Sequence, residues 1–215
     1  ATLHYHDIAM TAVRKDGLQL RRVPNGTGNY FAICMAAVQQ NGLALDHVGN
    51  ASLADWAGEG ADALIDAALK QNPLAIESVP LNDHRYADLA IDAIVQNNEA
   101  IRKVNTARTD YHEILEQAWE TGALKPTAIR YIVSDYARYA DIAVHAIIMN
   151  PNVVKYLNKF RKDYWEILEG AVENESLVLE MVPTDDAEKY ERLALMVMDH
   201  GSDPGVLRYV PANDP

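Results

Sequence analysis

The sequence predicts an all-α protein, namely an α-solenoid of about eight helix-turn-helix repeats of about 25 residues each. The first observation is self-similarity: AAVQQNGLALDHVG, which begins at Ala36, aligns with AALKQNPLAIESVP, which begins at Ala67. The second is that a small apolar residue recurs at spacings of 25 to 31 residues along nearly the whole chain. A unit of this length cannot bury its own apolar face, so neighbouring units must stack. The eight repeats are anchored at Ala12, Ala37, Ala68, Ala93, Ala118, Ala146, Ala171 and Val197.

The first helix of each repeat carries its apolar residues on one stripe. Ile or Leu stands four residues before every anchor, as Ile33 and Leu64 do, and this spacing is typical of an α-helix. Four residues after most anchors comes Asn or Gly, and both tolerate the left-handed conformation that ends a helix. Pro73 and Pro151 then mark the start of a short second helix. The expected helix-ending residues are Asn41, Asn72, Asn97, Gly122, Asn150 and Gly201.

Tyrosine is unusually frequent, with eleven residues against two phenylalanines. Seven of the eight repeats place a tyrosine seven residues before the anchor, on the same stripe as the apolar positions. One interpretation is a buried ladder between repeats, with neighbouring rings on adjacent repeats. The other is a comb of tyrosines that faces a ligand, and we favour the ladder. The seven are Tyr5, Tyr30, Tyr86, Tyr111, Tyr139, Tyr164 and Tyr190, and the third repeat has Ala61 instead.

The pattern predicts one repeat domain over residues 1–215, with an insertion at residues 49–60 between the second and third repeats. The terminal repeats of such arrays need a polar outer face. No polar helix precedes the first repeat, so we expect this domain to be part of a longer protein or to have its first repeat covered in an oligomer.

Two segments resemble a known family. YFAICMAAVQQNGLALDHVG, residues 30–49, and ALIDAALKQNPLAIESVP, residues 63–80, are similar to the bacterial tandem repeat called domain of unknown function 4116. The resemblance is strongest over residues 30–104 and fades to periodicity after Tyr111. It implies helical repeats in bacterial proteins, some of them secreted effectors, and it supplies no catalytic residues.

Composition excludes several classes of protein. The net charge of −12, from 31 acidic and 19 basic residues, argues against general nucleic-acid binding. The uncharged apolar stretch of residues 142–154 is shorter than the roughly 20 apolar residues that span a bilayer. Cys34 is the one cysteine, so the chain has no intrachain disulfide and no cysteine-built zinc site. It occupies an apolar position of the repeat, where we expect a buried small residue.

The chain carries no recognisable catalytic pattern. His4 and His6 are spaced for a metal only if the segment is not helical, because a helix directs the two rings to different faces. Paired carboxylates four residues apart, such as Glu169 with Glu173, are typical of the solvated faces of amphipathic helices. We therefore predict no catalytic residue, no metal and no cofactor, and a protein that is not an enzyme.

The charge map indicates a candidate binding surface. Residues 102–162 carry a net charge of +4 between segments of −8 and −10. Basic and tyrosine residues occupy matching positions in the second helices of three successive repeats, so we expect one continuous exposed strip. Solubility and ion pairing between repeats are one interpretation of these residues, and partner recognition is the other. The strip consists of Arg102, Lys103, Arg130, Tyr131, Lys155 and Tyr156.

The predicted function is a protein- or peptide-binding repeat scaffold without catalytic activity of its own. Its expected partner is an acidic peptide or an acidic protein surface, and nucleic acid is disfavoured because the acidic flanks repel a polyanion. The alternative is an accessory or targeting repeat domain of a larger bacterial enzyme or secreted effector. An autonomous enzyme that uses tyrosines and carboxylates is a third hypothesis. We expect a cytoplasmic protein, or one secreted into a host cell if it is an effector, and the oligomeric state stays open.

Overall fold

The computed structural model describes residues 4–56 and 58–199, and over these residues the chain forms helices and no strand. The predicted all-α helical-repeat fold is confirmed. The chain divides into two compact units, Ala1–Ala123 and Leu124–Pro215, and the boundary falls inside the fifth repeat. A single repeat domain over residues 1–215 stays a prediction. The expected second helix of the eighth repeat and Gly201 lie outside the described residues.

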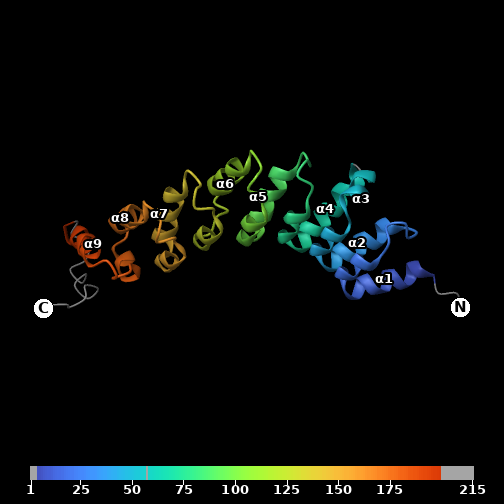
Figure 1. The fold of residues 1–215 in the computed structure, drawn as a ribbon, viewed down its shortest axis with the longest axis horizontal. Coiled ribbons are helices and arrows are strands. Elements are labelled where there is room, and N and C mark those ends of the chain that lie inside the picture. The colour runs from blue at the N-terminus through green and yellow to red at the C-terminus, as the bar shows by residue number, and fades with distance from the viewer. Residues whose placement is uncertain (1–3, 57, 200–215) are drawn as a thin grey trace. The chain divides into compact units, whose positions relative to one another are not determined.

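Unit 1 holds the first four repeats, the insertion and the first helix of the fifth repeat (Figure 1). Its α-helices are α1 (Tyr5–Lys15), α2 (Tyr30–Gln40), α3 (Asn50–Asp55), α4 (Glu59–Gln71), α5 (Tyr86–Gln96) and α6 (Tyr111–Glu120). Its second helices, labelled η, are η1 (Gly17–Arg22), η2 (Gly42–His47), η3 (Pro73–Ser78) and η4 (Asn98–Lys103). The helices η1 to η4 pack one against the next, so they form a row within the unit. Helix α3 is the predicted insertion and has no counterpart in the other described repeats.

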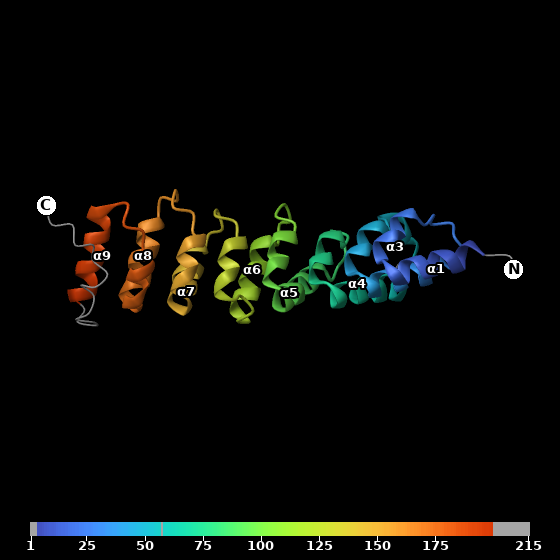
Figure 2. The same ribbon diagram turned by 90° about the horizontal axis from the view of Figure 1, so that it is seen from below.

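Unit 2 has the same construction. It comprises η5 (Pro126–Tyr131), α7 (Tyr139–Met149), η6 (Pro151–Tyr156), α8 (Tyr164–Asn174), η7 (Ser176–Met181) and α9 (Ala187–Asp199). Within this unit α7, α8 and α9 lie side by side in both ribbon views (Figures 1 and 2), and η5, η6 and η7 pack in a parallel row.

The second helices are 3₁₀ helices of six residues, a finding that refines the expectation of a short helix. Their buried apolar residues are three apart, as Ile76 and Val79 are, and a 3₁₀ helix has three residues per turn. Three of the seven begin with proline, at Pro73, Pro126 and Pro151, where a missing N–H costs nothing.

The expected left-handed asparagines are a wrong prediction. Asn41, Asn72, Asn97 and Asn150 have φ near −150° and are extended. Each asparagine side chain instead accepts a hydrogen bond from the backbone N–H two residues on, and so caps the 3₁₀ helix that follows. Gly122 does adopt the left-handed conformation, with φ +70°. These asparagines therefore act through the side-chain acceptor and not through backbone freedom.

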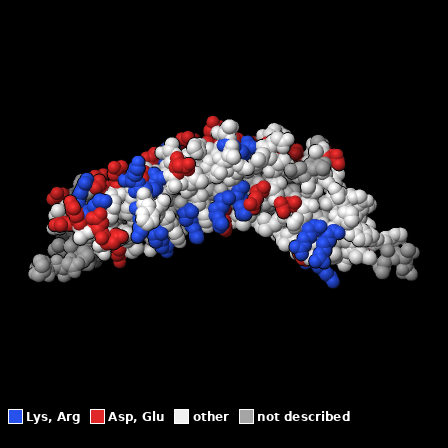
Figure 3. Space-filling model, viewed as in Figure 1, with Lys and Arg blue, Asp and Glu red and all other residues white. Residues whose placement is uncertain are grey.

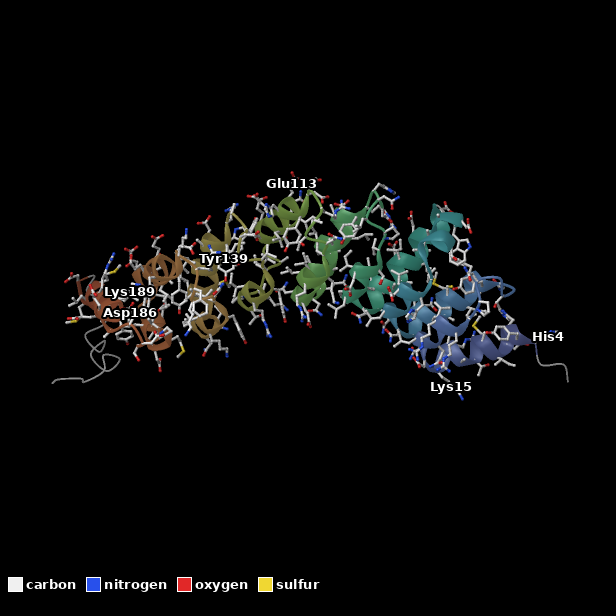
Figure 4. The ribbon with its side chains drawn as sticks, viewed as in Figure 1. His4, Lys15, Glu113, Tyr139, Asp186 and Lys189 are labelled. Atoms are coloured by element: carbon white, nitrogen blue, oxygen red, sulfur yellow. The ribbon has the colours of Figure 1, made fainter. Side chains whose placement is uncertain are left out.

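The ladder tyrosines are buried, which confirms that part of the interpretation we favoured, whereas ring contact between adjacent repeats stays a prediction. Tyr86, Tyr111, Tyr139 and Tyr164 are 1, 2, 3 and 4% exposed, and Tyr139 lies among the side chains of its unit in Figure 4. Only the first repeat departs, because Tyr5 is 52% exposed. Six of the tyrosines are the first residue of their α-helix, so each ring lies beside the loop that precedes it.

In unit 1 an arginine covers the ladder tyrosine. The guanidinium carbon of Arg108 lies 4.3 Å from the centre of the Tyr86 ring. Two nitrogens of Arg108 donate to the two carboxylate oxygens of Asp110 at 2.7 and 2.6 Å, and a third donates to the carbonyl oxygen of Leu81. The backbone N–H of Asn105 donates to the Tyr86 hydroxyl at 3.2 Å. The loop is thus fixed to the preceding repeat by charge, stacking and hydrogen bonding together.

Unit 2 repeats this arrangement with the same spacing. Arg161 lies 4.2 Å from the centre of the Tyr139 ring and donates to Asp163 at 2.8 and 2.6 Å. Burial raises the pKa of Tyr139, and the hydrogen bond from the backbone of Asn158 offsets part of that rise. The shared sequence pattern is Asn-x-x-Arg-x-Asp-Tyr, and we call the arrangement the arginine clasp.

The insertion supplies an aromatic ring beside the third repeat, which lacks a ladder tyrosine. Where the other repeats have tyrosine, the third has Ala61. The ring of Trp56, which directly follows α3, lies 5.9 Å from the Tyr30 ring and 5.1 Å from the Phe31 ring, edge to face with the latter. The insertion therefore completes the aromatic packing of the second repeat.

Candidate partner-binding surface

Four of the six strip residues come together in unit 2. Arg130 and Tyr131 end η5, and Lys155 and Tyr156 end η6, which packs against η5. The guanidinium carbon of Arg130 lies 5.0 Å from the Tyr131 ring centre and 4.9 Å from that of Tyr156. The ammonium nitrogen of Lys155 lies 5.2 Å from the Tyr156 ring centre. We call these four residues the cation–tyrosine cluster.

The two cations of this cluster keep their charge unneutralised at short range. Arg130 and Lys155 are exposed, and among residues 4–56 and 58–199 no carboxylate oxygen lies within 4.0 Å of their side-chain nitrogens. Cation–π contact orders the two side chains without cancelling their charge. The cluster is therefore an ordered positive surface with aromatic edges, a composition that is enriched where proteins meet partners.

A feature that follows the cluster closely along the chain was missed by reasoning from the sequence. Phe160 is 85% exposed and stands at the tip of the loop that carries the arginine clasp. The side chain of Asn158 accepts a hydrogen bond from the Phe160 backbone N–H at 3.0 Å, which fixes the turn. The ammonium nitrogen of Lys159 lies 5.7 Å from the Phe160 ring centre. Since Phe160 is four residues from Tyr156, its Cα lies within about 14 Å of the cluster. The run KYLNKF, residues 155–160, brings cations and aromatic residues together in the sequence but does not indicate that Phe160 is exposed.

The other two strip residues, Arg102 and Lys103, lie in unit 1 and are ion-paired. Arg102 lies 2.9 Å from Glu99 in the same 3₁₀ helix, and Lys103 lies 2.5 Å from Glu77 on the neighbouring one. Both cations are therefore partly neutralised, although the side chain of Arg102 is 55% exposed. One continuous strip of six residues stays a prediction, and the cations without a short-range carboxylate in the described residues are those of unit 2.

The remaining sequence candidates have structural roles. Cys34 is fully buried, and burial raises the pKa of its thiol to about 11. His6 Nδ1 lies 2.8 Å from the carbonyl oxygen of Gly28, so its ring fixes the loop before α2. Glu169, one of the paired carboxylates, lies 3.0 Å from Arg192 on the next α-helix.

Metal-binding and membrane-spanning features are absent from the described part of the chain. In residues 4–56 and 58–199, no three His, Cys, Asp or Glu side chains come together as a group that could hold a metal ion. Over the same residues no helix combines the length and the apolar character that a membrane crossing requires.

Comparison with known proteins adds no relative. No family model matches the chain, and no curated protein and no solved structure matches it either. The resemblance of residues 30–104 to domain of unknown function 4116 therefore stays a proposal. The functional role of the chain is inferred from the geometry of the cation–tyrosine cluster alone.

Proposed function

We propose that the protein is a repeat scaffold that binds an acidic segment of a partner protein through the cation–tyrosine cluster of unit 2. The observation that carries the proposal is the pair of exposed cations, Arg130 and Lys155, held against tyrosine rings without a carboxylate among the described residues. A carboxylate of the partner would supply the missing charge, and the tyrosine rings would cover its aliphatic carbons.

The exposed ring of Phe160 supports a partner whose acidic segment also carries an apolar side chain. Phe160 is 85% exposed, so an apolar side chain of the partner that covered it would stabilise the complex, since apolar burial contributes about 25 cal/mol per Å². Lys159 and Phe160, which are adjacent at this loop tip, add one more cation and one more aromatic ring to those of the cluster.

The surroundings of the cluster would help to position the partner. Residues 163–215 carry thirteen acidic and three basic residues, and acidic side chains crowd the surface over α8 and α9 in Figure 3. Repulsion from these carboxylates would oppose the binding of an anionic segment anywhere but on the cations. The same repulsion acts against a long polyanion such as nucleic acid, which could not avoid the acidic surface.

The test is a binding measurement on the full chain. The probe is a fluorescein-labelled peptide of alternating glutamate and leucine, followed by fluorescence anisotropy at moderate salt. We expect Arg130→Glu/Lys155→Glu to raise the Kd about tenfold or more, because the reversal places like charges together. Phe160→Ser should raise the Kd about three- to tenfold through the loss of apolar contact.

The matched control is Lys162→Glu, which reverses an exposed positive charge in the same unit outside the cluster. Its Kd should stay within about twofold of that of the wild-type chain. The proposal fails if the wild-type chain does not bind the peptide, or if the control weakens binding as much as Arg130→Glu/Lys155→Glu.

A further inference from the structure

Unit 1 contains a groove that the cation–tyrosine cluster does not involve. It has a volume of about 570 Å³, within the range of ligand-binding sites, and it crosses the carboxyl ends of η2, η3 and η4. Its floor is made of buried apolar residues, among them Leu45, Val79 and Val104. In unit 2 a pocket at an equivalent loop, beside Tyr164, has only about 160 Å³.

The insertion builds one wall of this groove. Gly49 and Leu53, at the start and in the middle of α3, both line it. Gly49 has φ +77° and Gly58 has φ +91°, conformations that favour glycine, so the chain leaves the repeat and returns to it at these two residues. Leu53 is 5% exposed and also lines a second pocket of about 510 Å³. The insertion thus adds a wall where regular repeats would simply stack.

The rim of the groove carries charges of both signs in spatial order. Asp46 on η2 and Glu77 on η3 are acidic, with side chains 73% and 60% exposed. Arg102 and Lys103 on η4 are basic. Since η2, η3 and η4 pack in sequence, the rim changes from acidic to basic along the row, and the Glu77–Lys103 ion pair marks the change.

This ion pair determines which ligands fit. A purely acidic ligand that bound Lys103 would leave Glu77 without its partner. A purely basic ligand that bound Glu77 would leave Lys103 without its partner. A ligand that brings one charge of each sign complements both members of this exposed pair, so that every charge keeps an opposite charge beside it. Such an exchange requires a ligand that reaches across neighbouring repeats, as an extended chain does on a solenoid.

We infer that the groove binds a peptide segment of a partner protein that carries a basic and an acidic side chain on either side of an apolar one. The basic side chain lies against Asp46 and Glu77, the acidic one lies against Lys103 and Arg102, and the apolar one covers the exposed side of Leu81, which is 50% exposed. The inference is independent of the proposed function of unit 2, because the cluster contributes no residue to the groove.

The test uses an array of immobilised nonapeptides with a central leucine. Each peptide has one lysine and one glutamate, in both orders and at several spacings, and matched spots replace either charge by glutamine. The array is probed with the labelled full chain as wild type and as Arg130→Glu/Lys155→Glu. Both should bind the best two-charge spots at least about tenfold more strongly than the matched single-charge spots, and in the same rank order.

A charge swap gives the decisive variant. Asp46→Lys/Glu77→Lys/Arg102→Glu/Lys103→Glu reverses the sign of all four charges on the rim and restores the ion pair between residues 77 and 103 with reversed sign, so folding is retained, and circular dichroism checks this. The swapped chain should prefer the opposite order of lysine and glutamate from the order that the wild type selects. The inference is overturned if no two-charge spot retains the wild-type chain, if single-charge spots bind equally well, or if a folded swap variant keeps the wild-type order. If the cluster of unit 2 failed to bind the acidic peptide, the proposed function would fail, and the result expected from the peptide array would stay the same.

Discussion

The two halves of the Arg/Lys/Tyr strip occupy equivalent positions of the repeat and have different partners. In unit 1, Lys103 is bound to Glu77 of the neighbouring repeat. In unit 2, Arg130 and Lys155 lie over tyrosine rings. The repeat therefore determines the position of a side chain. The neighbouring residues along the row determine whether a carboxylate neutralises its charge.

The effect of the neighbours can be followed at one equivalent position of the second helices, which we call the column. The column holds Glu77 in η3, Arg102 in η4, Arg130 in η5 and Lys155 in η6. Going from η3 to η4 the column changes from Glu77 to Arg102, and Glu77 forms its ion pair with Lys103, the residue that follows Arg102. Going from η5 to η6 it holds Arg130 and then Lys155, and like charges cannot pair. A change of sign along a column therefore predicts neutralisation, and a run of one sign predicts a free surface.

The largest expected effect tests whether a buried ladder tyrosine stabilises the two units to the same extent. Tyr86→Ala and Tyr139→Ala each remove a buried ring under an arginine clasp, and each should lower the free energy of unfolding of its own unit by about 3–5 kcal/mol. Hydrogen exchange, followed separately in the two units, measures the effect.

Tyr5→Ala is the matched control, because this tyrosine is 52% exposed and should cost less than about 1 kcal/mol. If either core substitution cost as little as the control, the ladder tyrosine would not stabilise the unit that contains it.

The next effect separates repeats whose 3₁₀ helix begins with glycine, as η2 does at Gly42, from repeats in which that position carries a side chain. A Cβ on Gly42 would clash with the backbone carbonyl oxygen of Ala68 in the next repeat, so Gly42→Ala should cost about 1–3 kcal/mol. The equivalent residue in unit 2 is Ser176, which already has a Cβ, and Ser176→Ala should stay within about 0.5 kcal/mol. Urea denaturation of the two variants makes the comparison, and equal stabilities would show that the close approach has no energetic consequence.

The third prediction concerns the pH dependence of stability, which should be the same in both units. The hydrogen bonds from Arg108 and Arg161 hold the pKa values of Asp110 and Asp163 below the ordinary value. A depressed carboxyl pKa stabilises the folded state above the unfolded pKa of about 3.9, and this contribution is lost as the pH falls through the folded value. The stability of the wild-type chain should therefore decline below about pH 4.

Asp110→Asn and Asp163→Asn should each lower stability at pH 6 and flatten the decline in acid, which thermal melts between pH 6 and pH 2.5 would record. A variant that declines in acid as steeply as the wild type would show that its clasp makes no contribution to the pH dependence.

Much of the fold could be predicted because repetition multiplies weak signals. The anchors, the buried tyrosines and the insertion all follow from aligning the chain with itself. The role of the capping asparagines could not be chosen from sequence alone, since asparagine suits both a left-handed helix end and a side-chain cap. The 3₁₀ geometry was implied by apolar residues three apart, although an α-helix also tolerates that spacing in one short turn.

The surface was harder to predict, since it depends on contacts between residues far apart in sequence. Lys103 meets Glu77 across 26 residues, and Arg108 covers Tyr86 across 22. The pattern Asn-x-x-Arg-x-Asp-Tyr occurs twice and could have indicated the clasp. The exposure of Phe160 could not be predicted, because phenylalanine at a loop tip is indistinguishable in sequence from one that folds back on the core.

The central claim is that the charges of unit 2, and not those of unit 1, are free to bind an acidic partner. The most direct measurement compares two charge reversals in the full chain, Arg130→Glu/Lys155→Glu and Arg102→Glu/Lys103→Glu, by the anisotropy of the labelled glutamate–leucine peptide. We expect the first to raise the Kd about tenfold or more and the second by less than about threefold, because Glu77 and Glu99 already neutralise the cations of unit 1. Equal losses, or a larger loss from the unit 1 reversal, would contradict the claim.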